Sequence, residues 1–165
     1  MSALDLVLTT LISEFSDMSD LETSVRVTTR LLLAAVLGGM LGYEREAQGH
    51  AAGIRTHMLV SLGAALFIIV ALQTNFDDDS LSRVMQGIVA GVGFLCAGTI
   101  IKSEGLSQVR GLTTAAGIWL TAAMGMAAGT GHGATAVLIT LLALFILHVI
   151  PRLLEKKTRV SSGKK

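Results

Sequence analysis

The sequence predicts an all-α fold: a polytopic membrane helix bundle with five transmembrane helices, the N-terminus outside and the C-terminus inside. Composition indicates a membrane protein, because 52% of the 165 residues are hydrophobic, only 15% are charged, and the mean hydropathy is +0.67. Long uncharged runs give the number of helices, and the placement of Lys and Arg gives their direction. The net charge of +1, without interleaved aromatic and basic residues, excludes nucleic acid as a partner.

The first element, residues 1–23, is expected to be an N-terminal interfacial amphipathic segment. Its stretch LDLVLTTLISEF is partly apolar but contains Asp5 and Glu14 and lacks a basic start, unlike a cleaved signal peptide. We therefore expect a helix that lies in the membrane interface, with a sixth span as the alternative.

The five spans come from uncharged runs, since a helix needs about 20 apolar residues to cross the hydrocarbon. The longest run is 41 residues and must hold two helices, which separate at the glycine-rich GTGHG turn. The shortest run has 13 residues, so its helix must begin near Ser24, with Arg26 and Arg30 snorkelling toward headgroups. The predicted helices are 24–43, 56–75, 83–102, 112–129 and 134–153, which form a membrane domain over 24–153, followed by a basic cytoplasmic tail over 154–165.

The direction of the spans follows from the basic residues, because Lys and Arg are retained on the cytoplasmic side. Ten of the thirteen lie in the first loop, the third loop and the C-terminal tail. The opposite side holds eight of the twelve acids, including those at 77–79. This asymmetry predicts the N-terminus outside and the C-terminus inside.

Glycines four residues apart predict where helix backbones approach each other closely. Packing within one chain and a homodimer seam both fit these positions. We expect the third span to lie near the bundle centre, so that Gly91→Leu lowers the amount of folded protein more than Ala71→Leu. The predicted packing glycines are Gly38, Gly42, Gly87, Gly91, Gly98, Gly125 and Gly129.

Charged residues crowd at the predicted inner face, and each of the main ones lies at the end of its helix where the helix dipole disfavours it. We therefore predict that Glu44 or Glu46 pairs with Arg55 or Arg110. Arg45 and Lys102 would then be free to bind lipid phosphates or acidic residues of a partner. The inner-face charged cluster consists of Glu44, Arg45, Glu46, Arg55, Thr56, Lys102, Glu104 and Arg110.

No combination of residues predicts catalysis, a metal site or a cofactor. Ser61, His57 and Glu44 have the residue types of a catalytic triad, but nothing in the sequence places them together. The three aspartates at 77–79 offer oxygen ligands suited to Mg²⁺. Consecutive carboxylates point in different directions, however, and this pattern is typical of a solvated loop.

Four motifs follow one another along the chain: RLLLAAVLGGMLGYERE, AGIRTHMLVSLGAALF, GIVAGVGFLCAGTII and VRGLTTAAGIWLTAAMGMAAG. In order and spacing they resemble the membrane domain of the MgtC/SapB family of bacterial inner-membrane proteins, over roughly residues 25 to 150. The family often continues into a soluble C-terminal domain, whereas only residues 153–165 follow Arg152, so we expect a stand-alone membrane domain. The virulence branch often has Asn and Cys where this chain has Thr113 and Thr121.

The resemblance implies a five-helix domain of the bacterial inner membrane, associated with magnesium limitation, acid stress and, in some members, virulence. It also implies a regulator of membrane partners such as the F-type ATP synthase, although members are often labelled magnesium transporters. A transporter usually keeps ionisable groups near the bilayer midplane, and the predicted spans have no Asp, Glu, Lys or Arg there. We therefore expect a non-enzymatic regulator. An ion transporter or channel with a path lined by Thr113 and Thr114 is the alternative.

Overall fold

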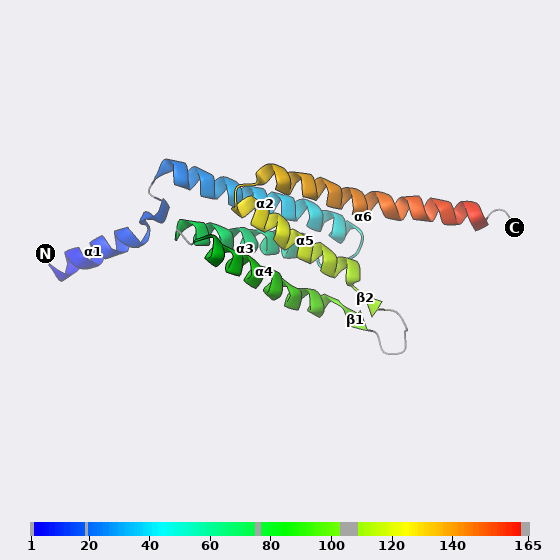
Figure 1. Ribbon diagram of the computed structural model, residues 1–165, viewed down its shortest axis with the longest axis horizontal. Helices are drawn as coiled ribbons and strands as arrows, with labels where there is room; N and C mark the ends of the chain where they lie inside the picture. Colours follow the sequence, from blue (N-terminus) through cyan, green and yellow to red (C-terminus); the bar gives the residue numbers. More distant parts are fainter. Residues whose placement is uncertain (1, 19, 75–76, 103–108, 163–165) are drawn as a thin grey trace.

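The computed structural model describes residues 2–18, 20–74, 77–102 and 109–162. Within them, six α-helices account for nearly all regular structure, and α2 to α6 are long and apolar enough to cross a membrane (Figure 1). The predicted all-α fold with five spans is therefore confirmed. The elements are α1 (Ala3–Glu14), a 3-10 turn (Ser16–Met18), α2 (Leu21–Ala47), α3 (Ile54–Gln73), α4 (Asp78–Thr99), β1 (Ile101–Lys102), β2 (Val109–Arg110), α5 (Leu112–Gly129) and α6 (Gly133–Ser162).

The helix starts differ from the prediction where acidic side chains cap a helix. α2 begins three residues earlier than predicted, because the Asp20 carboxylate accepts a hydrogen bond from the backbone N–H of Thr23 at 2.9 Å. α4 begins five residues early, because Asp77 accepts one from the backbone N–H of Ser80 at 2.9 Å. The dipole of each helix favours these carboxylates. The acids expected in loops are thus parts of helix N-termini.

Consecutive spans alternate in direction, so α2, α4 and α6 run one way and α3 and α5 the other (Figure 1). The α2–α3 connection, the β1–β2 hairpin and the C-terminal part of α6 therefore lie at one end of the bundle. We call this the basic end, and it comprises residues 44–55, 99–102, 109–112 and 150–162. It carries most of the chain's Lys and Arg residues.

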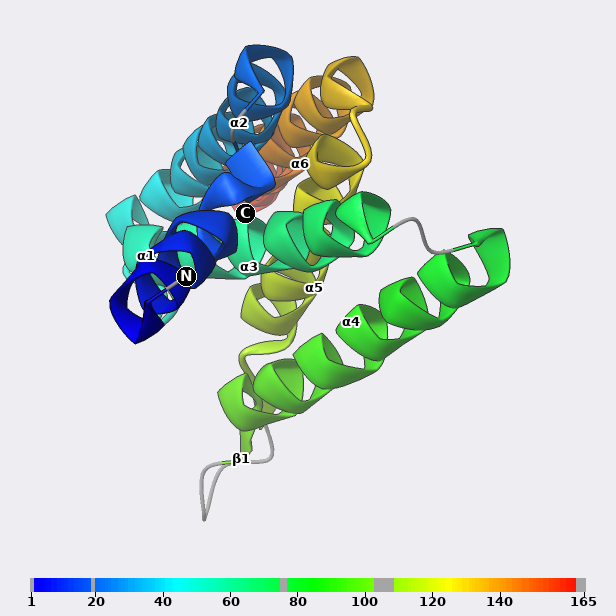
Figure 2. The same cartoon turned by 90° about the vertical axis from the view of Figure 1, so that its left-hand side faces the viewer.

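α3 lies between α2 and α5 and makes its most extensive contacts with these two helices (Figure 2). A Cβ on Gly38 of α2 would lie 2.6 Å from a carbonyl oxygen of α3, and a Cβ on Gly42 would lie 2.7 Å from an α3 Cα. From α5, a Cβ on Gly129 would lie 2.7 Å from another α3 carbonyl oxygen, and one on Gly125 would overlap α3 backbone. These four glycines let the three helices pack backbone against backbone.

α4 lies at the side of the bundle, away from α2 and α6 (Figure 2). Only 6% of its most apolar stretch is buried, against 56% for α5, and a Cβ on Gly87, Gly91 or Gly98 would meet nothing within 4 Å. The expectation that this span occupies the bundle centre is wrong. Val84 and Ile88 pack with apolar residues of α3 and α5, whereas the glycines of α4 have no such neighbours.

The connection from α4 to α5 includes a short antiparallel ladder, in which residues 101–102 pair with residues 109–110. α4 therefore ends at Thr99 rather than at the predicted residue 102. Gly111 precedes α5 with a φ of 93°, and a Cβ there would overlap the carbonyl oxygen of Thr99. This corner requires glycine, both for its left-handed backbone and for the close approach of the two chain segments. Glu104 of the predicted charged cluster lies outside the described residues.

At the end opposite the basic end, Arg30 binds the bundle rather than snorkelling to headgroups. Its guanidinium donates a hydrogen bond of 2.8 Å to the carbonyl oxygen of Gly129, the last residue of α5. A cation is favoured there by the α5 dipole. Arg26, in contrast, is exposed and pairs with Glu22 one turn away.

α1 projects from this same end of the molecule (Figure 1). It begins with a capping box, in which the side chains of Ser2 and Asp5 each accept a hydrogen bond from the other's backbone N–H. Its large apolar side chains are at least half exposed, and most of them share one helix face. Those on the shared face are Leu4, Leu8, Leu11, Ile12 and Phe15. The interfacial role of this segment stays a prediction.

Candidate functional site

The charged cluster at the basic end is built around a buried arginine. Arg45 is 2% exposed, and its Nε donates a hydrogen bond of 2.5 Å to Oε2 of Glu44. The second oxygen of Glu44 accepts a hydrogen bond from the side-chain amide of Gln48. The expectation that Arg45 is free for lipids or partners is therefore wrong. α2 continues beyond its predicted end, so residue 45 falls on the same inward face as Gly38 and Leu41.

Glu46 caps the helix that follows it. Its Oε2 accepts a hydrogen bond of 2.8 Å from the backbone N–H of Ile54, the first residue of α3. The N-cap residue of α3 is Gly53, which offers no side chain, and a Cβ there would overlap the Glu46 carboxylate. The carboxylate thus lies at the N-terminus of α3, where the dipole favours an anion, although it is disfavoured at the end of its own helix.

The predicted pairing of these glutamates with Arg55 or Arg110 is not found. Arg26–Glu22 and Arg45–Glu44 are the ion pairs in the part of the chain that the structure describes. Arg55 and Arg110 are exposed, as is Thr56. Each glutamate is satisfied within the α2–α3 connection, so no clamp between hairpins is needed to explain it. The side chain of Lys102 lies outside the described set.

A second group of polar side chains lies inside the bundle, on α3. His57 and Ser61 follow each other by one turn of α3, and both are 0% exposed. The Nδ1 of His57 is 3.0 Å from the carbonyl oxygen of Gly53, which assigns the ring hydrogen to Nδ1 and leaves Nε2 as an acceptor. The Nε2 of His57 and the Oγ of Ser61 have no hydrogen-bond partner within the described structure.

The walls around this pair are made of glycine backbone. A Cβ on Gly38 of α2 would lie 2.9 Å from the Cβ of Ser61, and one on Gly117 of α5 would lie 3.5 Å from Nε2 of His57. Thr121, also 0% exposed, donates its hydroxyl to the carbonyl oxygen of Gly117 at 2.8 Å. The spacing of His57 and Ser61 is the sequence signal that could have revealed the pair, because residues four apart share a helix face.

The two threonines predicted to line an ion path do not lie together. Thr114 is buried, while Thr113 is exposed on the outside of α5. Thr140 of α6 is also buried, and its hydroxyl donates to the carbonyl oxygen of Ala136 one turn earlier. No group of three or more His, Cys, Asp or Glu side chains placed to hold a metal ion occurs among the described residues.

The aspartates considered as magnesium ligands belong to the start of α4. Asp77 is the N-cap, and Asp78 and Asp79 occupy the first turn. Hydrogen bonds from the side chain and the backbone of Ser80 hold the pKa of Asp77 below its usual value of 3.8. These acids therefore stabilise the helix start.

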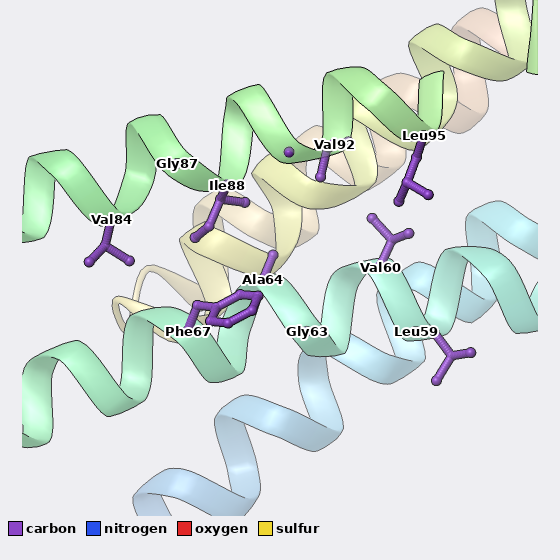
Figure 3. Close-up of a pocket in the computed structure, with 11 residues that line it drawn as sticks. Leu59, Val60, Gly63, Ala64, Phe67, Val84, Gly87, Ile88, Val92 and Leu95 are labelled. Carbon is purple, nitrogen blue, oxygen red and sulfur yellow. The ribbon is translucent and has the colours of Figure 1, made fainter. Parts of the chain in front are cut away.

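A groove of about 620 Å³ separates α3 from α4 (Figure 3). Its lining is apolar on both sides, with Val60 and Ala64 on α3 facing Ile88 and Val92 on α4. Gly91 forms part of the α4 wall. We call this the α3–α4 groove. It lies within the segments that are apolar enough to cross the membrane.

Comparison with known proteins identifies this architecture, since residues 31–156 match the MgtC family model. The chain belongs to the MgtC family. It is 43% identical to protein SrpB of Synechococcus elongatus in an alignment of 135 positions that covers 75% of this chain and 74% of that protein. It is 43% identical to YhiD of Escherichia coli in an alignment of 138 positions that covers 77% of this chain and 63% of YhiD. It is 42% identical to protein MgtC of Brucella abortus in an alignment of 125 positions that covers 74% of this chain and 51% of that protein.

Membership of the MgtC family, together with the five apolar helices, makes this a multi-pass bacterial membrane protein. The match with YhiD covers 63% of that protein, and the match with MgtC covers 51%. YhiD of the Escherichia coli K12 strain is named as a candidate magnesium transporter. No solved structure matches the chain.

Proposed function

We propose that the chain is a non-enzymatic protein of the bacterial inner membrane that regulates another membrane protein during adaptation to low magnesium or acid stress. In this proposal the N-terminus is outside, the basic end faces the cytoplasm, and the helix over residues 3–14 lies in the outer interface. The membrane domain over 24–153 carries the regulatory contact. Residues 154–165 form a basic cytoplasmic segment that continues α6 as far as Ser162.

The observation that carries this proposal is the α3–α4 groove. Its walls are apolar, and its α4 wall contains Gly87 and Gly91, where an added Cβ would have no neighbour within 4 Å. Small residues let the backbone of a second helix approach closely, and close approach is the main source of helix association in lipid. An apolar transmembrane helix of a partner protein fits such a groove.

The family resemblance makes the F-type ATP synthase the first partner to test. A second copy of this chain is the competing occupant, because a small-residue face also suits a homodimer. The two occupants give different results. Binding to the synthase alters ATP-driven proton pumping, whereas self-association changes the mass of the purified protein and leaves pumping unchanged.

Gly91→Leu tests the groove, and Ala90→Leu is the matched control. Both substitutions add a large side chain to an exposed position of α4, but residue 90 does not line the groove. We expect Gly91→Leu to abolish both co-purification of ATP synthase subunits and the effect of the protein on proton pumping in inverted membrane vesicles. Ala90→Leu should preserve both. Pumping that responds equally to the two variants would contradict a regulatory contact in this groove.

A second candidate function, ion transport, is favoured by one observation. The Nε2 of His57 and the Oγ of Ser61 are buried without partners in the described structure, and such polar atoms inside a membrane bundle are typical of ion pathways. Magnesium uptake into liposomes containing only this protein tests the idea. A regulator gives no flux. Flux that disappears in Ser61→Ala would favour transport and overturn the regulatory proposal.

A further inference from the structure

A cavity of about 800 Å³ lies between α2 and α6 at the basic end, in a region where these two helices run side by side (Figures 1 and 2). Its lining is divided by chemistry. Met40 and Leu144 supply apolar surface on the side toward the membrane interior, whereas Gln48, His148 and Arg152 supply polar groups toward the end of the bundle. We call it the α2–α6 cavity.

The depth of the cavity in the membrane follows from helix length. α6 carries no charged residue before Arg152, and the 20 residues from Gly133 to Arg152 span about 30 Å at 1.5 Å per residue. This length equals the hydrocarbon thickness of a typical bilayer, about 30 Å. Arg152 therefore lies where the hydrocarbon meets the headgroups. The cavity opens at the level of lipid phosphates and extends toward the level of the acyl chains.

Among the described side chains that line the cavity, Arg152 is the cation and Glu44 the anion. The two carboxylate oxygens of Glu44 are engaged by Arg45 and Gln48. Arg152 forms no ion pair within the described residues. Because the Glu44–Arg45 pair is neutral, Arg152 makes this described lining net positive. His148 and the exposed Tyr43 add groups that can donate hydrogen bonds.

We propose that the α2–α6 cavity binds one phospholipid with a singly negative headgroup, such as phosphatidylglycerol. The Arg152 guanidinium pairs with the phosphate diester, whose two free oxygens match its planar donor geometry. One acyl chain lies over Met40 and Leu144. The headgroup hydroxyls meet Gln48 and His148. The site thus contacts both the headgroup and an acyl chain. A soluble phosphate would make only the polar contacts.

The test uses the full chain, purified in detergent and stripped of lipid, with binding followed by native mass spectrometry. The probes are dioctanoyl phosphatidylglycerol, dioctanoyl phosphatidylcholine and glycerol 3-phosphate. We expect phosphatidylglycerol to bind more tightly than phosphatidylcholine, and glycerol 3-phosphate not to bind. Arg152→Gln should weaken phosphatidylglycerol binding about tenfold, the loss expected for one charge-assisted contact.

Two further variants separate this site from general attraction to a basic surface. Arg55→Gln removes an exposed cation at the same end of the bundle, outside the cavity, and should leave binding unchanged. Ala47→Phe fills the cavity from an exposed position at the end of α2 and should block binding. Equal losses for Arg55→Gln and Arg152→Gln, intact binding in Ala47→Phe, equal affinity for the two lipids, or binding of glycerol 3-phosphate would each overturn the proposal.

Discussion

Replacing Glu44 by Gln should destabilise the folded protein more than replacing its partner Arg45 by Met. The two side chains are 10% and 2% exposed and 2.5 Å apart. Breaking a buried ion pair from one side costs about 3–5 kcal/mol, because a buried charge is left unpaired. Glu44→Gln leaves the arginine in that state but keeps a hydrogen-bond acceptor, so we expect a loss of about 3 kcal/mol in the free energy of unfolding. Arg45→Met also leaves one partner behind, but the Glu44 carboxylate is the more exposed of the two and keeps its hydrogen bond from Gln48, so this substitution should cost about 1 kcal/mol.

The double variant tests the pairing itself. Glu44→Gln combined with Arg45→Met should cost no more than Arg45→Met alone, which corresponds to a coupling energy of about 3 kcal/mol. Unfolding in detergent micelles, followed by helical circular dichroism, measures all three variants. Glu22→Gln is the control, because the Arg26–Glu22 pair is 54% and 76% exposed and should leave the melting curve unchanged. Additive costs of the two single substitutions would refute the dependence of Arg45 on Glu44.

Three further predictions follow from the fold. Ala71→Leu should lower the yield of folded protein in membranes more than Gly91→Leu, because Ala71 is 3% exposed while residue 91 faces open space. This ranking is the reverse of the one predicted from sequence. Equal yields would argue against the open position of α4. The pKa of Asp77 is lowered by hydrogen bonds from the side chain and backbone of Ser80, so its cap stabilises α4 above the unfolded pKa of 3.8 and is lost as the pH falls through the lower folded value. Melting of Asp77→Ala should therefore vary less with pH in this acid range than melting of the wild type. A reporter that is active only in the cytoplasm should work when fused after Lys165 and be silent in the α3–α4 loop, and a silent Lys165 fusion would contradict the proposed orientation.

The five spans could be predicted because hydrocarbon excludes charge, so the ends of membrane helices are visible in the sequence as charged residues. The same reasoning placed the end of α2 too early. The charged residues that follow Tyr43 look like a loop, but α2 continues to Ala47 and turns Arg45 onto its inward face. A buried arginine is compatible with a helix end only when its counter-charge is adjacent, and this depends on side-chain geometry that spacing does not specify.

Glycines spaced four residues apart did not all lie at helix contacts. Gly38 and Gly42 have the same four-residue spacing as Gly87 and Gly91, yet the first pair contacts α3 backbone and the second meets open space. The difference lies in the neighbours, because α4 contacts α3 through larger side chains such as Ile88 and leaves its glycines uncovered. Spacing predicts which residues share a helix face, and it does not predict what covers that face.

The two candidate functions involve different faces of α3. His57 and Ser61 point into the core that α2 and α5 close, whereas Val60 and Ala64 border the α3–α4 groove. A substitution on α4 that fills the groove does not touch the buried pair, and Ser61→Ala does not change the groove lining. Because α3 is held backbone to backbone by glycines on two sides, it has little room to shift and cannot easily transmit a change from one face to the other. Loss of partner binding without loss of flux, or the converse, is therefore interpretable as an effect on one face alone.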